Sequence, residues 1–158
     1  MNEEVRVGLG VDFHLLREGE SLVLGGVEFD YHLGTVAHSD GDVLLHAICD
    51  ALLGAAGLGD IGENFPDDDP AYKDISSLEL LRRVTDKLSE QGFQVVNVDS
   101  TLIIEKPRVG PERERMVEVI SGVVSAPVNV KATTTEGLGF IGSEDGVGAQ
   151  AVAALRRE

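Results

Sequence analysis

Apolar and polar residues alternate along several short segments of the chain, and this period of two predicts β-strands. Residues 5–12 form the first such segment, and residues 93–106 and 128–132 form two more. Residues 21–31 carry Gly25-Gly26 between two apolar runs, which predicts a β-hairpin with a tight glycine turn. Because these strands are spread along the chain, the predicted sheet gathers distant segments.

The first predicted helix, residues 39–54, is apolar on almost every side. Ser39 and Asp42 stand at capping-box spacing near its start, with Asp in place of the usual Glu or Gln. The polar residues Asp42, His46 and Asp50 form a single row at i, i+4 spacing. Because a helix this apolar packs on several sides, the row is expected to face a ligand, a cavity or a partner.

Two further helices are predicted. One begins at Ser76 or Ser77 and ends at Gly92, and the other begins near Pro111. The residues expected to face the core are Leu78, Leu81, Val84 and Leu88 in the former, and Met116, Val119, Ile120 and Val123 in the latter. Between the first two helices, several glycines and the turn-rich residues 64–70 predict a loop that could close over a site.

Residues 146–156 leave two alternatives open, because their alanines favour a helix whereas tertiary contacts can override that propensity. Elsewhere, strands and helices mix through hairpin and crossover connections. We therefore expect an α+β fold, in which residues 1–158 form a single domain with a mixed β-sheet, helices packed on one face and an N-terminal β-hairpin.

The composition narrows the class of protein. A chain of 158 residues with 42% hydrophobic residues suits one globular domain. The net charge of −15 argues against a nucleic-acid-binding surface, although cations and backbone amides can still provide a local site for phosphate. No apolar run is long enough to cross a bilayer and the acidic start is unlike a signal peptide, so we expect no membrane partner and a cytoplasmic location. Cys49, the single cysteine, is expected to be a buried thiol rather than a nucleophile.

The pair Asp12 and His14 is the strongest sign of a metal site. In an extended segment alternate side chains point the same way, so these two side chains are expected to lie together. His46, on the polar row of the first helix, is a possible third ligand. Two imidazoles and one carboxylate are typical of a catalytic zinc site with its fourth position open. The alternative is that these are ordinary polar residues, since spacing alone does not bring the two segments together.

A second group of polar residues follows the predicted strand 128–132. Lys131 to Glu136 combine a cation, three threonine hydroxyls and a carboxylate, which suits phosphate binding through the hydroxyls and a hard cation on Glu136. A polar turn with threonines suited to a strand is an equally good interpretation. Residues 102–108 leave another strand into a loop with a proline, where backbone groups could contact the edge of a base. A plain connection between strand and helix is the simpler interpretation.

Six motifs, taken in order, resemble those of one family. They are Gly-x-Gly-x-Asp-x-His at 8–14, Ala-His-Ser-Asp-Gly-Asp at 37–42, Asp-Ala-Leu-Leu-Gly-Ala-Ala at 50–56, Gly-Asp-Ile-Gly at 59–62, Phe-Pro-Asp at 65–67 and Lys-Ala-Thr-Thr-Thr-Glu at 131–136. The chain resembles the 2-C-methyl-D-erythritol 2,4-cyclodiphosphate synthase family from end to end. The resemblance implies conversion of 4-diphosphocytidyl-2-C-methyl-D-erythritol 2-phosphate into the cyclic diphosphate and CMP, in non-mevalonate isoprenoid synthesis. It also implies a homotrimer with active sites between neighbouring subunits.

The resemblance also implies roles for single residues. Asp12, His14 and His46 would bind Zn²⁺, and Glu136 would hold Mg²⁺ or Mn²⁺ together with the substrate diphosphate. His38 and Thr134 would be the catalytic residues. The implied substrate-binding residues are Asp12, His14, His38, Ser39, Asp60, Ile61, Gly62, Phe65, Pro66, Asp67, Asp68, Asp69, Ile104, Glu105, Lys106, Pro107, Arg108, Val109, Gly110, Thr133, Thr134, Thr135, Glu136 and Phe140.

Two positions depart from the family pattern. Ser143 stands where many relatives carry an arginine that contacts phosphate, and Gly137 replaces a common lysine. Both departures remove positive charge. We therefore hypothesise that phosphate binding in this chain depends more on the metals and on Lys131.

Two other functions remain possible from the residues. A zinc hydrolase would use the open metal position to make hydroxide, and a metal-stabilised trimeric module would bind nucleotides or isoprenoid phosphates without reaction. A further hypothesis concerns the helix row: Asp42 or Asp50 could accept a hydrogen bond from His46 and orient the imidazole, as metal-bound histidines commonly require.

Overall fold

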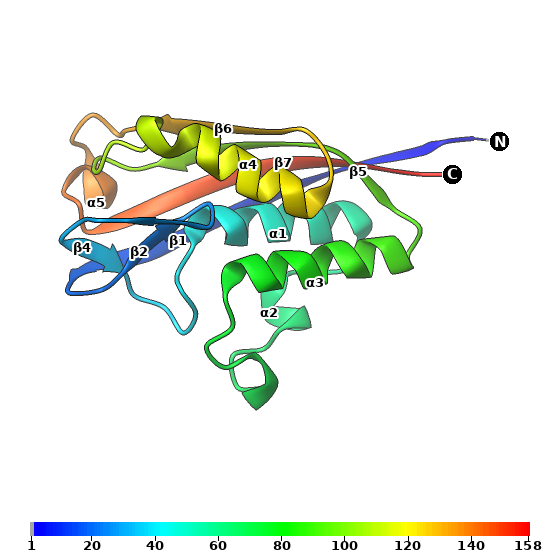
Figure 1. Cartoon of the computed structure of the whole chain (residues 1–158), viewed down its shortest axis with the longest axis horizontal. Coiled ribbons are helices and arrows are strands. Elements are labelled where there is room, and N and C mark those ends of the chain that lie inside the picture. The colour runs from blue at the N-terminus through cyan, green and yellow to red at the C-terminus, as the bar shows by residue number, and fades with distance from the viewer. Residues whose placement is uncertain (1) are drawn as a thin grey trace.

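A mixed five-stranded sheet forms the frame of the computed structural model, which describes residues 2–158 (Figure 1). Its strands are β1 (Glu4–Glu18), β4 (Leu33–Thr35), β5 (Gln94–Ile103), β6 (Val128–Thr133) and β7 (Gly146–Arg157). They lie in the order β4-β1-β7-β5-β6. The β5–β6 pair is parallel and the other pairs are antiparallel, so the predicted mixed sheet is confirmed.

The predicted hairpin is a separate two-stranded sheet of β2 (Leu22–Leu24) and β3 (Val27–Phe29). Gly25 and Gly26 form its turn with φ angles of 61° and 77°. A side chain is strained at such angles, whereas glycine adopts them readily.

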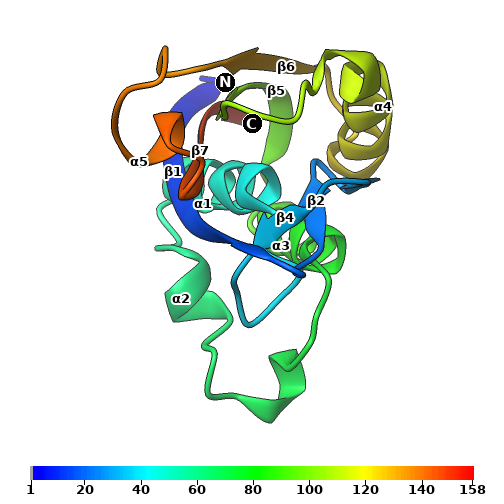
Figure 2. The same ribbon diagram turned by 90° about the vertical axis from the view of Figure 1, so that its left-hand side faces the viewer.

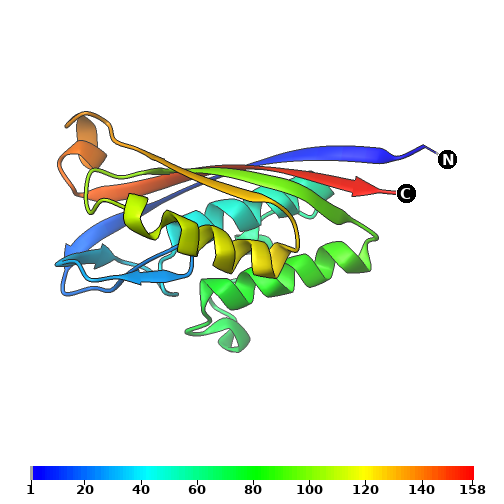
Figure 3. The ribbon, with the colours of Figure 1, turned by 45° about the horizontal axis from the view of Figure 1, so that its top comes forward.

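Three long helices, α1 (Val43–Ala56), α3 (Ser77–Glu90) and α4 (Arg113–Val124), cover one face of the sheet (Figures 1 and 3). The predicted α+β architecture with helices on one face is therefore correct. Shorter helical segments are α2 (Ile61–Asn64), α5 (Gly139–Gly142) and the 3₁₀ turns η1 (Pro70–Tyr72) and η2 (Gly110–Glu112). Across residues 2–158, no helix has the length and apolar character needed to cross a membrane.

Helix α1 is the centre of the core, but its ends differ from the prediction. Asp42, not Ser39, is the N-cap, and its carboxylate accepts a hydrogen bond of 3.0 Å from the Leu45 N–H. The helix continues past Gly54 and ends at Gly57, whose φ of 71° closes the last turn. The predicted capping box was wrong because Asp42 accepts the bond itself, which places the first helical residue three positions later.

Glycines allow α1 to lie directly on β1. A Cβ atom at Gly10 would stand 1.8 Å from the Ala47 carbonyl oxygen, and one at Gly8 would stand 2.0 Å from that of Ala51. No side chain fits at such distances, so the strand can touch the helix backbone only with glycine at these two positions. Because side chains alternate along β1, the residues two and four positions beyond Gly10 face the same helix.

Strand β7 settles the ambiguous segment 146–156 as a strand. Residues 146–149 are all buried, and from Ala149 on the buried Ala151, Ala153 and Leu155 alternate with exposed or half-buried residues. The alanines face α1 in the middle of the sheet, where small side chains allow close packing, so tertiary contact overrides their helix propensity.

The core faces of the other helices need two small corrections. In α3 the buried leucines include Leu80, while Leu78 is only half-buried and packs at the edge of the core. In α4 the buried residues are Met116, Ile120 and Val124, whereas Val119 and Val123 are half-buried. The predicted Leu81, Val84 and Leu88 are buried in α3, whereas in α4 the buried stripe shifts to Val124, because several neighbouring apolar residues fit the same helical spacing.

The face of β1 that points away from α1 is apolar and exposed. Val7, Leu9 and Leu15 keep 67%, 65% and 58% of their surface exposed, and Phe13 keeps 49%. Large contiguous apolar patches on a protein surface commonly mark interfaces. This face of the sheet is therefore the best candidate for contact with another protein chain.

Candidate active site

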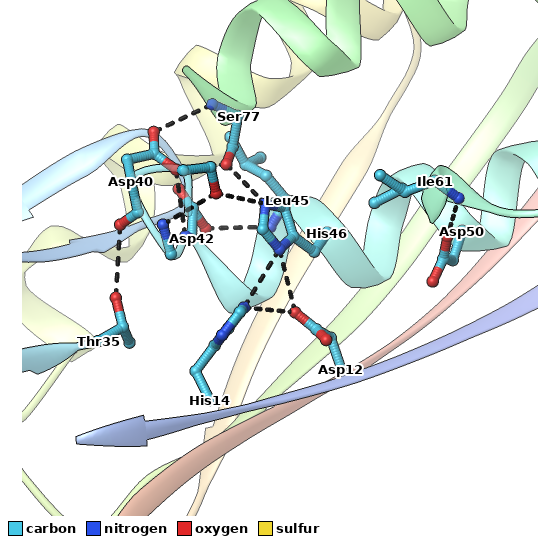
Figure 4. Close-up of polar contacts among 12 residues, drawn as sticks. Asp12, His14, Thr35, Asp40, Asp42, Leu45, His46, Asp50, Ile61 and Ser77 are labelled. Atoms are coloured by element: carbon cyan, nitrogen blue, oxygen red, sulfur yellow. Dashed lines mark hydrogen bonds and ion pairs between the residues drawn. The ribbon is translucent and has the colours of Figure 1, made fainter. Parts of the chain in front are cut away.

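Asp12 and His14 meet His46 where β1 passes the first turns of α1 (Figure 4). The His14 Nε2 atom lies 2.9 Å from Asp12 Oδ2, and His46 Nδ1 lies 3.2 Å from the same oxygen. The two imidazole nitrogens are 3.2 Å apart. The structure thus brings together the three residues that the sequence predicts as a metal site, and we call them the Asp-His-His cluster.

The spacing of these atoms suits a metal ion. Zinc bonds of about 2.0–2.1 Å in a tetrahedron place ligand atoms about 3.3–3.4 Å apart. The three separations of 2.9, 3.2 and 3.2 Å are close to that value. Each residue offers one atom, so a tetrahedral ion held here keeps one position for another ligand, as in catalytic rather than structural sites.

The charges of the cluster depend on one another. Burial by itself raises the pKa of Asp12, but hydrogen bonds with His14 and His46 outweigh burial and lower the pKa of that carboxyl to about 2. For His46, burial alone lowers the pKa, while the Asp12 carboxylate more than compensates and raises it above the usual 6.5. Asp12 is therefore a permanent anion that attracts either a proton or a metal ion to the histidines.

The predicted contact of Asp42 or Asp50 with His46 is wrong. Asp42 is fully buried and accepts hydrogen bonds from the N–H groups of Gly25, Gly26 and Leu45, so it joins the hairpin turn to the start of α1. Asp50 accepts instead from the Ile61 N–H at 2.9 Å. The i, i+4 row places both aspartates near His46 along the helix, but nearby backbone donors take their carboxylates.

A serine that the sequence interpretation had assigned only to helix capping contacts His46 instead. Ser77 Oγ lies 2.8 Å from His46 Nε2, and Ser39 Oγ lies 3.4 Å from the same nitrogen. Ser77 also contacts Asp40 (Figure 4). The available signal was weak, because a serine at the start of a helix usually indicates a cap.

Two adjoining cavities open beside the cluster. The larger, of about 550 Å³, is lined by the cluster together with His38, Ser39, Asp50, Asp60, Ile61, Gly62, Phe65 and Asp67. The smaller, of about 310 Å³, reaches from His38 and His46 to Tyr72, Lys73 and Ile75, which the sequence interpretation missed. Most of the predicted binding residues between 12 and 67 thus line one connected hollow.

The loop after α2 forms one wall of this hollow. Phe65 is buried and packs edge-to-face on Tyr72, with ring centroids 5.2 Å apart. Asp60 caps α2 and Asp69 caps η1. Pro66, Asp68 and Asp69 belong to the same loop but lie outside the two cavities. The aromatic contact anchors the loop, which leaves Asp67 facing the hollow.

The other predicted residues lie apart from the cluster. In the sheet order, β6 is three strand spacings from β1, which is about 14 Å. Figures 1 and 2 show β6 and α2 on opposite sides of α1. Thr133, at the end of β6, and Thr134, Glu136 and Phe140, which follow it, are exposed. Within one chain, the structure therefore does not bring the two predicted groups together.

Residue Glu105 organises this second group. Its carboxylate accepts hydrogen bonds from the N–H groups of Thr135 at 2.8 Å and Gly137 at 3.3 Å, and from the Thr135 hydroxyl at 3.2 Å. The Thr135 N–H is the main cause of the lowered pKa of Glu105. Ile104 and Val109 are buried in the core, so only their backbone can contact a ligand. We call residues 104–110 and 133–140 the second group.

Two residues of the charge hypothesis have partners within the chain. Lys131 forms an ion pair with Asp99, which competes with any phosphate for its ammonium group. Ser143 donates a hydrogen bond of 2.7 Å to Asp145.

Phe140 packs edge-to-face on Phe13 of the exposed apolar face, with centroids 5.9 Å apart. The second group therefore adjoins that face.

Comparison with known proteins gives a consistent result. Residues 5–156 match the YgbB family. The 2-C-methyl-D-erythritol 2,4-cyclodiphosphate synthase of Desulfatibacillum aliphaticivorans is 54% identical over 154 residues, covering 96% of this chain and 99% of that protein. The bifunctional IspDF of Campylobacter jejuni superposes with a TM-score of 0.94 at 41% identity, covering 99% of this chain and 43% of that one. A 2C-methyl-D-erythritol-2,4-cyclodiphosphate synthase in its CDP-bound form gives 0.88 at 37%, with 95% and 99% covered.

Proposed function

The chain belongs to the YgbB family of 2-C-methyl-D-erythritol 2,4-cyclodiphosphate synthases, and from that membership we infer its reaction. It converts 4-diphosphocytidyl-2-C-methyl-D-erythritol 2-phosphate into 2-C-methyl-D-erythritol 2,4-cyclodiphosphate and CMP, in non-mevalonate isoprenoid synthesis. The observation that carries this function is the Asp-His-His cluster, whose three residues line a cavity of about 550 Å³.

We propose that the cluster holds Zn²⁺ through Asp12 Oδ2, His14 Nε2 and His46 Nδ1. The separations of 2.9 to 3.2 Å and the mixed nitrogen and oxygen donors support this choice. A bound zinc ion supplies positive charge and a coordination position for a substrate phosphate oxygen. We assign that phosphate and the methylerythritol portion to His38 and Ser39, which line the same cavity.

The chemistry needs no protein nucleophile. The 2-phosphate of the substrate attacks the β-phosphorus of the diphosphate, the bond from that phosphorus to the CMP oxygen breaks, and CMP leaves. Because an anion attacks an anion, the protein has to neutralise charge and align two ends of one molecule. Alignment of this kind reaches effective molarities of about 10⁵–10⁸ M. Cys49 takes no part, since burial raises its pKa well above the ordinary value.

We further propose that the active site is completed by a second subunit, in a homotrimer. Two observations support this arrangement: strand β6, which leads into Thr134 and Glu136, lies about 14 Å from β1 in the same sheet, and the apolar face of β1 is exposed. In a closed ring, each cluster meets the second group of a neighbour. There Thr134 would donate to phosphate, Glu136 would hold Mg²⁺ or Mn²⁺, and residues 104–110 with Thr133 would contact the cytidine end.

The remaining walls fit the rest of the substrate. We assign the ribose to Asp60 and Gly62, beside the cluster, and the methylerythritol portion to the loop at residues 65–69. The relative solved with CDP has the same fold, which supports a cytidine diphosphate-linked ligand here. We propose the cytoplasm as the place of the reaction, because a reducing compartment suits the free, buried Cys49.

Product analysis in ¹⁸O-labelled water tests the proposed function against its alternatives. The cyclisation predicts equal amounts of CMP and cyclic diphosphate, neither containing solvent oxygen. A zinc hydrolase would give a linear product that carries one ¹⁸O atom, and a binding module would give no product. Either of these outcomes in zinc- and magnesium-supplemented enzyme would contradict the proposal.

A further inference from the structure

We propose that Ser77 is a positioning residue for the metal site: it joins Asp40 to His46 and holds the imidazole with its proton on Nε2 and its Nδ1 lone pair directed at the metal. This inference rests on the proposed zinc ligands. It adds Ser77 and Asp40, which are not themselves ligands and do not line the two cavities. Ser77 is the first residue of α3 and Asp40 precedes α1, so the link also ties the two helices together.

The contacts around Ser77 are short and buried. Its side chain is fully buried, and Oγ lies 2.8 Å from His46 Nε2 (Figure 4). The same hydroxyl contacts Asp40 Oδ1, and the Ser77 N–H donates to Asp40 Oδ2 at 3.0 Å. Asp40 Oδ1 also accepts from the Asp42 N–H at 3.2 Å. The Asp40 carboxylate is thus fixed from two sides, and it fixes Ser77 in turn.

The direction of each hydrogen bond follows from the chemistry of its groups. A carboxylate only accepts, so the Ser77 hydroxyl donates its one proton to Asp40. The Ser77 oxygen can then only accept from His46, which requires the imidazole proton on Nε2. Nδ1 is left with its lone pair, and this is the atom that lies 3.2 Å from both Asp12 Oδ2 and His14 Nε2. Three residues in series therefore determine which nitrogen can bind a metal ion.

Ser39 is a weaker candidate for the same task. Its hydroxyl lies 3.4 Å from His46 Nε2, which is long for a hydrogen bond, and it already accepts from the Gly41 N–H at 3.2 Å. Ser39 also lines the cavity, where the substrate is expected. The shorter, fully buried contact with Ser77 is the one that can hold the imidazole while substrate and product exchange at the proposed metal site.

The chain offers a matched control at the neighbouring position. Ser76 is the N-cap of α3 and accepts a hydrogen bond of 3.1 Å from the Glu79 N–H. Its loss removes the cap of α3 and lowers the stability of that helix, without touching His46. Ser77→Ala and Ser76→Ala therefore each remove one serine hydroxyl, from adjacent residues. Only Ser77→Ala breaks the link to the metal site.

The test is zinc affinity, measured by chelator competition on the whole protein. Ser77→Ala should bind Zn²⁺ about 10- to 100-fold more weakly than the wild-type protein. Ser76→Ala should stay within about twofold of wild type despite a lower melting temperature, and Ser77→Thr, which keeps the hydroxyl, should recover most of the affinity. Equal losses in the two alanine variants, or no loss in Ser77→Ala, would overturn the inference. If the wild-type protein itself bound no zinc, the proposed zinc site would fail instead.

A spectroscopic measurement on the wild-type protein alone covers the case in which a variant does not fold. In ¹⁵N NMR of the zinc-loaded protein, His46 should show a proton on Nε2 that exchanges slowly with water, because Ser77 accepts it in a buried position. Zinc on Nε2, with the proton on Nδ1, would contradict the assignment. In Ser77→Ala the Nε2 proton should exchange faster, while the signals of His38, which Ser77 does not contact, should stay unchanged.

Discussion

Replacing Gly10 by alanine should separate the two elements that hold the metal cluster. Its Cβ atom would lie 1.8 Å from the Ala47 carbonyl oxygen and 2.7 Å from the Ala51 amide nitrogen. Both contacts are with the backbone of α1, which cannot swing aside as a flexible side chain can. Strand and helix would therefore have to move apart, and His46, next to Ala47, would move with the helix.

The size of the movement can be estimated from the contact. Real Cβ atoms essentially never come closer than 3.0 Å to such an atom, so the 1.8 Å contact requires a retreat of about 1.2 Å. A metal site tolerates deviations of about 0.2 Å in its ligand distances. A shift of about 1 Å is enough to lower activity by about 100-fold, and overpacking of a core costs about 1–3 kcal/mol of stability.

The assays are zinc affinity by chelator competition, CMP release and thermal unfolding. For Gly10→Ala we expect both zinc affinity and turnover to fall by about 100-fold, and the melting temperature to fall by roughly 2–4 °C for each kcal/mol lost. Gly54→Ala is the matched control. Gly54 lies in α1, the helix that Gly10 contacts, and a Cβ atom there would meet nothing closer than the Leu9 carbonyl oxygen at 4.0 Å.

The control should behave in the opposite way. Alanine in a helix is about 0.5–1 kcal/mol more favourable than glycine, so Gly54→Ala should keep full activity and be slightly more stable. The reasoning would be refuted if Gly10→Ala kept its zinc affinity within about threefold of wild type, since the strand and helix would then have absorbed the methyl group without moving the ligands.

Three further predictions follow from the cluster, the exposed face and the departures from the family pattern. Because the folded protein raises the pKa of His46 above 6.5, the stability from its protonation is present below that value and lost as the pH rises through the folded pKa. Thermal unfolding of the metal-free protein should therefore show lower stability at higher pH, whereas zinc affinity should rise by up to about tenfold per pH unit for each proton displaced. If stability and zinc affinity changed in the same direction with pH, this account would be contradicted. Leu9→Asp, on the exposed apolar face, should give monomers in analytical ultracentrifugation that bind zinc but release no CMP, and an active monomer would exclude the subunit interface. Ser143→Arg, which restores a phosphate-contacting charge, should lower the KM at matched magnesium; an unchanged KM would remove support for the charge hypothesis.

The sequence predicts the metal cluster well because two simple periods determine it. Alternation along β1 places Asp12 and His14 on the side of Gly8 and Gly10, and the helical row of α1 exposes His46. The glycines then become interpretable as the positions where the strand touches the helix. The geometry of the site is thus a direct consequence of local patterns in one strand and one helix.

The sequence was less informative where several groups compete for one hydrogen bond. Asp42 stands one turn from His46, yet its carboxylate serves three backbone N–H groups at the hairpin turn and the helix start. Ser77, more than 30 residues away along the chain, takes the position next to the imidazole. Helical spacing identifies neighbours along a helix but not the loops that pack against its end.

Strand β7 shows a different limit. Its alanines favour a helix by propensity, but in the fold Ala149, Ala151, Ala153 and Leu155 alternate with exposed or half-buried residues. In the sequence, Val152 and Ala154 stand at positions where a half-buried strand would carry polar residues, so the alternation of burial appears only in the fold. The sequence therefore left helix and strand open for this segment, because alanine is compatible with both patterns.

The proposed contact between the cluster and the second group does not form within one folded chain. Thr134 and Glu136 lie on exposed loops beyond β6, on the far side of the sheet order from β1. No internal pattern can join them to Asp12, because the proposed junction lies between subunits. The exposed apolar residues of β1 point to such a contact from the chain itself.

Mixed oligomers test this arrangement most directly. His46→Ala removes a cluster ligand and Glu136→Gln removes the carboxylate of the second group, so each variant alone should be inactive. In trimers assembled at random from equal amounts of both, about one quarter of the sites combine an intact cluster with an intact second group from the neighbour. We predict that the co-assembled protein recovers about a quarter of the wild-type rate of CMP release. No recovery in verified mixed trimers would contradict the proposal that each active site is shared between two subunits.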